Sequence, residues 1–99
     1  MKIIGEDKLE RFWHEYRQAE APLKKWRQAV IDSSWCNFFD VRNSFRSADY
    51  YKGAVIFDVG GNKYRLIATI HYRKKIVYVD KIMTHLEYST DKWKRQYDS

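Results

Sequence analysis

The chain has few of the residues that cross-link a protein or interrupt its elements: its 99 residues include one cysteine, one proline and four glycines. A single cysteine, Cys36, excludes an internal disulfide and a zinc site made of several cysteines. No apolar stretch approaches the roughly 20 residues that span a membrane, and the N-terminal MKIIGEDKLERFW lacks the apolar segment of a signal peptide. From these absences we expect a cytoplasmic protein with no membrane partner.

Acidic residues are scarce relative to basic ones, with 13 Asp and Glu against 19 Lys and Arg, which gives a formal charge of +6. A basic surface attracts polyanions, with nucleic acid as the first candidate and an anionic membrane or an acidic protein as the second. Charge kept for solubility alone explains the excess equally well. The carboxylates are scattered and no glycine-rich loop precedes a helix, so we expect neither a metal nor a cofactor.

Apolar residues are plentiful, at 44% of the chain with 17% aromatic, which is enough for one folded domain over 1–99. Helical spacing predicts a helix from about Glu6 to Arg17 and a second helix that begins near Pro22. Together they predict a helical hairpin over about 6–34. The apolar positions of the two helices are Leu9, Phe12, Trp13, Tyr16, Leu23, Trp26, Ala29 and Val30.

Residues 35–49 have no sustained period and are expected to form a loop. The composition then shifts to β-branched and aromatic residues in AVIFDV, KYRLIATIHY and IVYVDKIM. This predicts an antiparallel meander over about 50–84, with two-residue turns at Gly60–Gly61 and Lys74–Lys75, and a C-terminal turn and tail over 85–99. The expected fold class is α+β, with the helical hairpin packed on the sheet and a short helical or irregular tail. The face predicted to contact the helices carries Val55, Phe57, Tyr64, Leu66, Ala68, Ile70, Tyr72, Val77, Val79 and Met83.

The opposite face of this sheet is expected to meet solvent and to gather cations from neighbouring strands among apolar residues, although any solvated sheet face would also be polar. A nuclease without a metal must deprotonate a ribose 2′-hydroxyl, stabilise charge on the phosphate and protonate the 5′ leaving oxygen. Arg65 and Lys52 are candidates for stabilising charge, while His85 and Tyr88 would move protons or stack on a base. The structural alternative is that Tyr88 packs over the sheet edge and His85 caps a turn. Candidates for binding RNA are Lys63, Lys81, His71 and Arg73.

The segment YYKGAVIFDVGGNKYRLIATIHYRKKIVYVDKIMTHLEY resembles the HigB family of type II toxins, within the RelE superfamily, through its GNKYRL strand and its THxEY ending. The resemblance implies a RelE-like α+β fold, ribosome-dependent cleavage of translated mRNA, and neutralisation by a HigA-like antitoxin with a helix-turn-helix domain. Arg65 and Tyr88 match family positions, His85 lies where many relatives place a basic residue, and Lys52 matches more loosely.

The sequence also departs from the family pattern at two positions. Asp80 stands where relatives often carry Arg, and Ser89 stands where they often carry Asp, so a basic contact is either lost or moved to Lys81. Two other functions fit the same fold, namely a gyrase-inhibiting toxin of the ParE type and a non-catalytic RNA-binding module. The combined His and Tyr ending favours the nuclease over the gyrase inhibitor.

Overall fold

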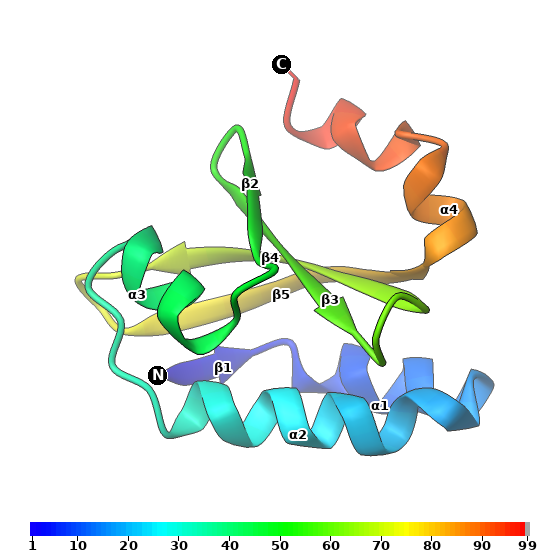
Figure 1. The fold of residues 1–99 in the computed structure, drawn as a ribbon, viewed down its shortest axis with the longest axis horizontal. Coiled ribbons are helices and arrows are strands. Elements are labelled where there is room, and N and C mark those ends of the chain that lie inside the picture. The colour runs from blue at the N-terminus through cyan, green and yellow to red at the C-terminus, as the bar shows by residue number, and fades with distance from the viewer. Residues whose placement is uncertain (99) are drawn as a thin grey trace.

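The computed structural model describes residues 1–98 and contains a five-stranded sheet with helices on both of its faces (Figure 1). The longest helices run together along one face, and the C-terminal elements lie on the other side of the sheet (Figure 1). In chain order the elements are β1 (Lys2–Ile4), α1 (Glu6–Glu15), the 3₁₀ turn η1 (Arg17–Ala19), α2 (Glu20–Ile31), α3 (Phe38–Ser44), β2 (Asp49–Tyr51), β3 (Ala54–Val59), β4 (Tyr64–His71), β5 (Ile76–Thr84), α4 (His85–Ser89) and the 3₁₀ turn η2 (Lys92–Gln96).

The sheet has the order β1-β5-β4-β3-β2, and strands β2 to β5 form the antiparallel meander expected from the sequence. The first strand was not expected. It pairs in parallel with β5, placing Lys2 opposite Ile76, so the prediction of a purely antiparallel sheet is wrong. A strand of three residues carries too little alternation to be recognised, and its partner lies far along the chain.

The helical hairpin is confirmed, with small changes at its ends. Helix α1 stops at Glu15 rather than near Arg17, because Tyr16 leaves the helical conformation at φ −114° and ψ 86°. Pro22 lies in the first turn of α2, where its missing N–H costs no hydrogen bond. The expected loop over 35–49 is wrong in part, since it contains α3. Asn37 begins that helix by accepting a hydrogen bond from the Asp40 N–H at 3.0 Å.

The main core lies between the sheet and the helices α1 and α2. The largest fully buried side chains include Phe57, Leu9 and Leu23, which shows that the helical stripe and the strand alternation were assigned to the correct sides. Every sheet position predicted for this face lies in or against the main core except Met83. Full burial of side chains of this size stabilises the fold by about 1.5 to 3 kcal/mol each.

Both predicted hairpin turns are too short, with different consequences for the two hairpins. Val59 pairs with Tyr64, which leaves residues 60–63 as the turn and shifts the expected register by an even number, so each side chain keeps its face. Between β4 and β5 a bulge leaves Asp80 without a partner, and this extra residue reverses the alternation that follows it. Met83 therefore leaves the main core, and Ile82 packs against it instead.

The second face of the sheet is not the solvated surface that was expected. Ala54, Ile56 and Ile67 form a second core there, together with Met83 and Trp93. The residues packed against this cluster are Tyr51, Tyr88 and Tyr97. The C-terminal elements α4 and η2 cover this face (Figure 1). Trp93 was overlooked because the tail has no apolar period of its own.

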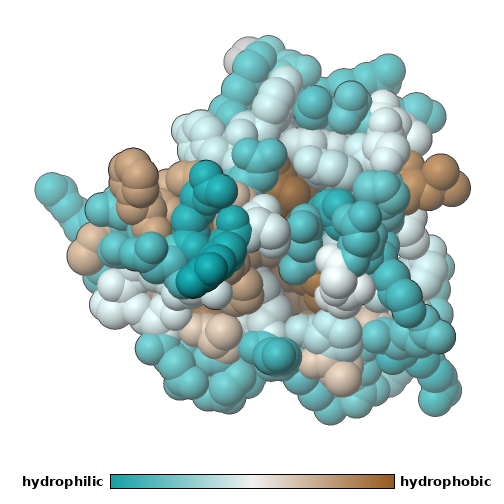
Figure 2. Space-filling model, in the orientation of Figure 1, coloured by the Kyte–Doolittle hydropathy of each residue, from teal (hydrophilic) through white to brown (hydrophobic). Residues whose placement is uncertain are grey.

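The face of the molecule seen in Figure 2 is mostly hydrophilic, with apolar side chains in small separate patches. Phe39 and Leu86 are the most exposed large apolar residues, at 80% and 79%.

At the edge of β5 not covered by β1, the Lys8 ammonium donates to the carbonyl oxygens of Val79 at 3.1 Å and Asp80 at 3.0 Å. Within residues 1–98, no helix combines the length and apolar character needed to cross a membrane.

Candidate active site

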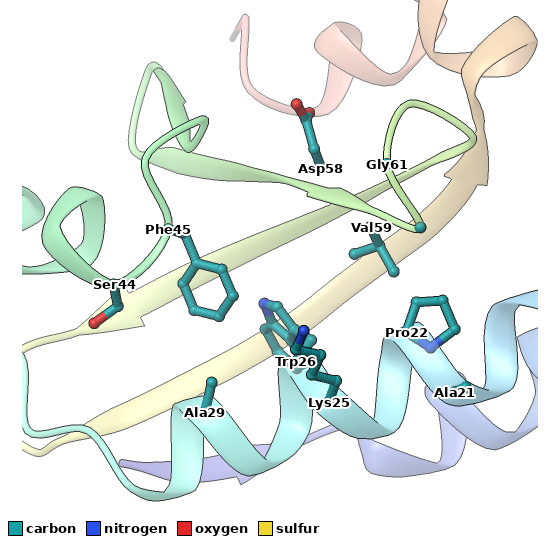
Figure 3. Close-up of a pocket in the computed structure, with 11 residues that line it drawn as sticks. Ala21, Pro22, Lys25, Trp26, Ala29, Ser44, Phe45, Asp58, Val59 and Gly61 are labelled. Carbon is teal, nitrogen blue, oxygen red and sulfur yellow. The ribbon is translucent and has the colours of Figure 1, made fainter.

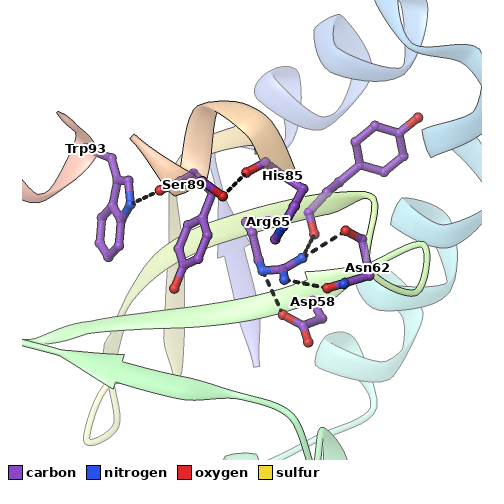
Figure 4. Close-up of polar contacts among 8 residues, drawn as sticks. Asp58, Asn62, Arg65, His85, Ser89 and Trp93 are labelled. Atoms are coloured by element: carbon purple, nitrogen blue, oxygen red, sulfur yellow. Dashed lines mark hydrogen bonds and ion pairs between the residues drawn. The ribbon is translucent and has the colours of Figure 1, made fainter. Parts of the chain in front are cut away.

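Arg65 is the centre of the most connected polar cluster in the described chain, and it is buried rather than exposed on a solvated face as expected, with 7% of its surface accessible. Its Nε lies 3.0 Å from the Asp58 carboxylate and its Nη2 donates to Asn62 Oδ1 at 2.6 Å. Its Nη1 donates to the carbonyl oxygen of Tyr64 at 3.1 Å. These partners surround the guanidinium in Figure 4.

The β3–β4 hairpin assembles this cluster. Asp58 and Arg65 are directly paired across the two strands, so their side chains leave the sheet on the same face. Gly60 and Gly61 have φ values of 66° and 69°, a conformation that favours glycine and that turns the chain back toward β4. The turn thereby returns Asn62 to the guanidinium, which it contacts through its side-chain oxygen.

Tyr88 joins the cluster from α4. The Arg65 guanidinium lies 5.1 Å from the centre of the Tyr88 ring, a cation–π contact, and the Trp93 indole stacks on the same ring at 5.3 Å and 14°. Burial raises the pKa of the Tyr88 phenol, the charge of Asp49 adds to the rise, and Arg65 opposes it. The phenol is therefore protonated at neutral pH. Because the ring is engaged, its hydroxyl, which makes no hydrogen bond within residues 1–98, is the group best able to meet a substrate.

His85 begins α4 but does not cap it. Thr84 is the N-cap residue, and its side chain and that of Glu87 each accept from the other's backbone N–H. The part of the alternative in which His85 caps the turn is therefore wrong, whereas Tyr88 does pack on the sheet, against its second core. The His85 backbone N–H donates to the Lys63 carbonyl at 2.8 Å, which ties the start of α4 to the residue before Tyr64. The imidazole is exposed and makes no hydrogen bond within residues 1–98.

Lys52 lies on the same side of the sheet as Arg65 but at a distance from it. It occupies the β2–β3 turn at φ 45°, and its Nζ is 3.1 Å from Asp98 Oδ1. The hydrogen bond to Asp98 raises the pKa of Lys52. At about 3.3 Å per residue, the distance from Ala54, next to this turn, to Asp58 is roughly 13 Å along β3. The structure does not bring Lys52 to the Arg65 cluster.

The candidate RNA-binding residues divide into two groups. Lys63 lies beside the start of α4, and its Nζ donates to Gln18 Oε1 at 3.0 Å. Lys81 pairs with Ile67 and lines a groove at the open edge of β5. His71 and Arg73 lie at or beyond the far end of β4, roughly 20 Å from Arg65 at about 3.3 Å per residue. Only the first two are near the Arg65 cluster.

Three residues of the cluster were missed, namely Asp58, Asn62 and Trp93. A longer turn between β3 and β4 would have revealed the first two, because only that register places Asp58 opposite Arg65. Within residues 1–98, no three His, Cys, Asp or Glu side chains are grouped so that they could hold a metal ion.

A separate apolar hollow of about 590 Å³ lies between α2 and the β3–β4 hairpin, with Pro22, Trp26, Phe45 and Val59 among its walls (Figure 3). Lys25 also borders it. The indole N–H of Trp26 is buried and has no hydrogen-bond partner within residues 1–98. Most of the walls are apolar, and the one carboxylate among them, Asp58, is already ion-paired with Arg65, so this hollow offers no acid–base chemistry comparable with that around Arg65.

The fold and the cluster define a small α+β protein of the RelE-like type, in which a buried strand arginine meets a tyrosine from the helix that follows the last long strand. Residues 19–91 match the HigB_toxin family, described as the RelE-like toxic component of a toxin-antitoxin system, and the chain belongs to this family. It is also similar to the mRNA interferase HigB of Escherichia coli O6:H1 (strain CFT073), with 29% identity over 100 residues that cover 98% of this chain and 95% of that protein. Family membership confirms the resemblance and makes an antitoxin the partner of this toxin.

Proposed function

We propose that the protein is a ribosome-dependent endoribonuclease that cleaves mRNA during translation. The observation that carries the proposal is the contact between Arg65 and Tyr88 next to an unengaged His85, at the end of the sheet where α4 begins. The name of the Escherichia coli relative, an mRNA interferase, supports the substrate. We further propose that residues 1–99 act as one toxin domain in the cytoplasm, where ribosomes are found.

The proposed reaction needs no metal ion. His85 takes the proton of the ribose 2′-hydroxyl, and the resulting alkoxide attacks the adjacent phosphorus. The bond to the 5′ oxygen breaks, and Tyr88, which is protonated at neutral pH, gives that oxygen its proton. The products are a 2′,3′-cyclic phosphate and a 5′-hydroxyl.

Arg65 stabilises charge in this scheme from a restrained position. A guanidinium has five N–H donors. Nη1 of Arg65 donates to the carbonyl oxygens of Asn62 and Tyr64, Nη2 donates to Asn62 Oδ1, and Nε is ion-paired with Asp58. The second N–H of Nη2 would donate to a phosphate oxygen. A donor held rigidly toward the developing charge stabilises the transition state more than a mobile donor does, because no reorganisation is needed as the charge forms.

The remaining basic residues would guide the RNA strand. We expect Lys63, by exchanging its hydrogen bond to Gln18, and Lys81 to hold neighbouring phosphates, and Lys52 to meet the strand further along the same face. We propose a HigA-like helix-turn-helix protein as the antitoxin, with an acidic or amphipathic segment that covers this basic face or distorts it.

The test is to supply the purified protein with mRNA on programmed ribosomes and, in parallel, with the same mRNA alone. We expect new 5′ ends within the coding region only in the ribosome sample, and 3′ ends that carry a cyclic phosphate. Intact mRNA in both samples would contradict the proposal, and inhibition of DNA gyrase by the same preparation would then support a ParE-type function. Equal cleavage of free mRNA would remove the dependence on the ribosome.

A further inference from the structure

The C-terminal 3₁₀ turn contributes a tryptophan to the candidate active site. Trp93 is the second residue beyond the segment matched to the family, and only 5% of its surface is accessible. Its indole stacks on the Tyr88 ring, and its Nε1 donates to the carbonyl oxygen of Tyr88 at 3.1 Å. The same indole meets the edge of Tyr51 at 5.5 Å. One side chain therefore fixes both the ring and the backbone of Tyr88.

The helix that carries Tyr88 needs such support. Helix α4 has five residues, far below the length at which an isolated helix is stable in water. The Thr84 cap secures its first turn, but Tyr88 lies near its end. Without the indole, the stacked face of Tyr88 would be open to water, and the rotamer of its ring would be restrained only by Arg65 and the rest of the second core.

The segment that carries Trp93 is anchored on both sides. Upstream, the indole N–H bonds to Tyr88. Downstream, the Tyr97 hydroxyl donates to Asp80 Oδ2 at 2.6 Å, and Asp98 accepts from the Tyr51 hydroxyl and lies 3.1 Å from Lys52 Nζ. Asp80 is the residue left unpaired by the β-bulge, and it also accepts from Thr69 Oγ1 at 2.7 Å. These bonds place the turn in one position on the sheet.

We propose that Trp93 is a positioning residue for RNA cleavage: it holds the Tyr88 ring in the plane that directs the hydroxyl toward the RNA and keeps water from that ring. On this proposal, residues 92–98 form part of the active site, because they hold Trp93 against Tyr88. This inference rests on the proposed function, because it assigns Tyr88 a task in cleavage. The opposite reading is that Trp93 occupies the place of a nucleobase and blocks the site. The hydrogen bond from the indole to the Tyr88 backbone favours the positioning role, since a ring that only blocks the site would stack on Tyr88 without needing this bond.

The experiment compares Trp93→Ala, Trp93→Phe and the wild type, with Trp13→Ala as a matched control. Trp13 is a half-buried tryptophan of α1 that packs against the main core and lines a groove beside α2, away from Tyr88. Two quantities are measured for each protein. The first is the pKa of the Tyr88 phenol, followed by NMR of ¹³C-labelled tyrosine with Tyr88→Phe to assign the signal. The second is kcat and KM for cleavage of mRNA on ribosomes.

We expect Trp93→Ala to lower the pKa of Tyr88 toward its ordinary value of 10.0, because burial is the main cause of the rise. We also expect kcat to fall roughly 10- to 100-fold, the range for a displaced catalytic group, with little change in KM. Trp93→Phe keeps a stacking ring and loses the N–H, so both quantities should lie between those of Trp93→Ala and the wild type. Trp13→Ala should change neither.

A rise in kcat for Trp93→Ala would overturn the proposal and identify Trp93 as a block. An unchanged Tyr88 pKa together with an unchanged kcat would overturn it as well. If Trp93→Ala does not fold, Tyr97→Phe removes a single anchoring hydroxyl and should shift both quantities in the same direction by less. If the wild type cleaves no mRNA, the proposed function fails, but the Tyr88 titration still decides whether Trp93 holds that ring.

Discussion

The guanidinium of Arg65, on β4, lies 5.1 Å from the centre of the Tyr88 ring, on α4. This contact joins the interior of the sheet to the segment that follows it. Arg65 is held by a carboxylate, an amide and carbonyl oxygens, so Tyr88 rests on a cation that cannot move freely. Under the proposed function, stability and cleavage depend on the same residues, and variants must be chosen to separate the two.

Asp58→Ala should destabilise the protein, because it leaves the buried Arg65 cation without its counter-charge. Breaking a fully buried ion pair costs about 3 to 5 kcal/mol, and we expect roughly 2 to 3 kcal/mol here since the Asp58 side chain is 31% exposed. Urea denaturation gives the free energy of unfolding. Asp7→Ala is the control, because its pair with Arg11 is exposed and should contribute less than about 1 kcal/mol. Equal losses for both variants would show that Arg65 finds another partner.

His85→Ala should slow mRNA cleavage on ribosomes by roughly 100-fold or more if the imidazole transfers a proton. The free energy of unfolding should stay the same, since the side chain is exposed and Thr84 caps the helix. His14→Ala, at an exposed position of α1, is the control for loss of an imidazole far from the cluster. Wild-type cleavage by His85→Ala would exclude His85 from the chemistry.

Tyr88→Phe should also slow cleavage by roughly 100-fold while ribosome binding and folding persist, because the hydroxyl removed has no partner among residues 1–98. The pH dependence of cleavage gives a further prediction for Tyr88. Since the pKa of Tyr88 is raised above 10.0, the phenol keeps its proton throughout the neutral range, and activity should not fall on the alkaline side until above pH 10. A loss of activity centred well below that pH would show that another group supplies the proton.

Alkaline pH should loosen the C-terminal segment before it unfolds the main core. Burial, and then the hydrogen bond and charge of Asp80, raise the pKa of the Tyr97 phenol above its ordinary 10.0. The folded state thus resists ionisation of Tyr97, so its contribution to stability is complete below pH 10 and is lost as the pH rises beyond it. Urea denaturation between pH 7 and 11 should show a shallower decline for Tyr97→Phe than for the wild type. Identical slopes would mean that Tyr97 is neither buried nor held by Asp80 in solution.

The sequence was most informative where a pattern is local. Helical spacing placed Leu9 and Leu23 in the core, and strand alternation placed Phe57 and Leu66 opposite them. The assignment of side chains to the two faces of the sheet stayed correct despite the wrong turn length between β3 and β4, because that register shift is even. The bulge at Asp80 made it wrong for the following residues, because one extra residue exchanges the two faces. Nothing local in the sequence distinguishes these two errors.

Elements that are stabilised by residues far away in the sequence could not be predicted from local patterns. The pairing of Lys2 with Ile76 joins the two halves of the chain, and Trp93 is buried only because β3, β4 and β5 present an apolar second face. For the candidate site, the structure brings together Arg65 and Tyr88, which were both named from the sequence. Their supports were missed, because the position of Asp58 depends on the length of the β3–β4 turn and that of Trp93 on how the C-terminal segment packs on the sheet. The roles assigned to Arg65, His85, Tyr88 and Lys52 in cleavage stay predictions.

Lys8 has a consequence for the behaviour of the free toxin in solution. An open strand edge is where the sheet of one molecule can extend into that of another, the first step of aggregation. The Lys8 ammonium already donates hydrogen bonds to the carbonyl oxygens of Val79 and Asp80 at such an edge, on β5. A second strand that paired there would have to bury or displace that charge. When the antitoxin is absent and the toxin accumulates alone, we expect this lysine to protect the edge of β5 from self-association.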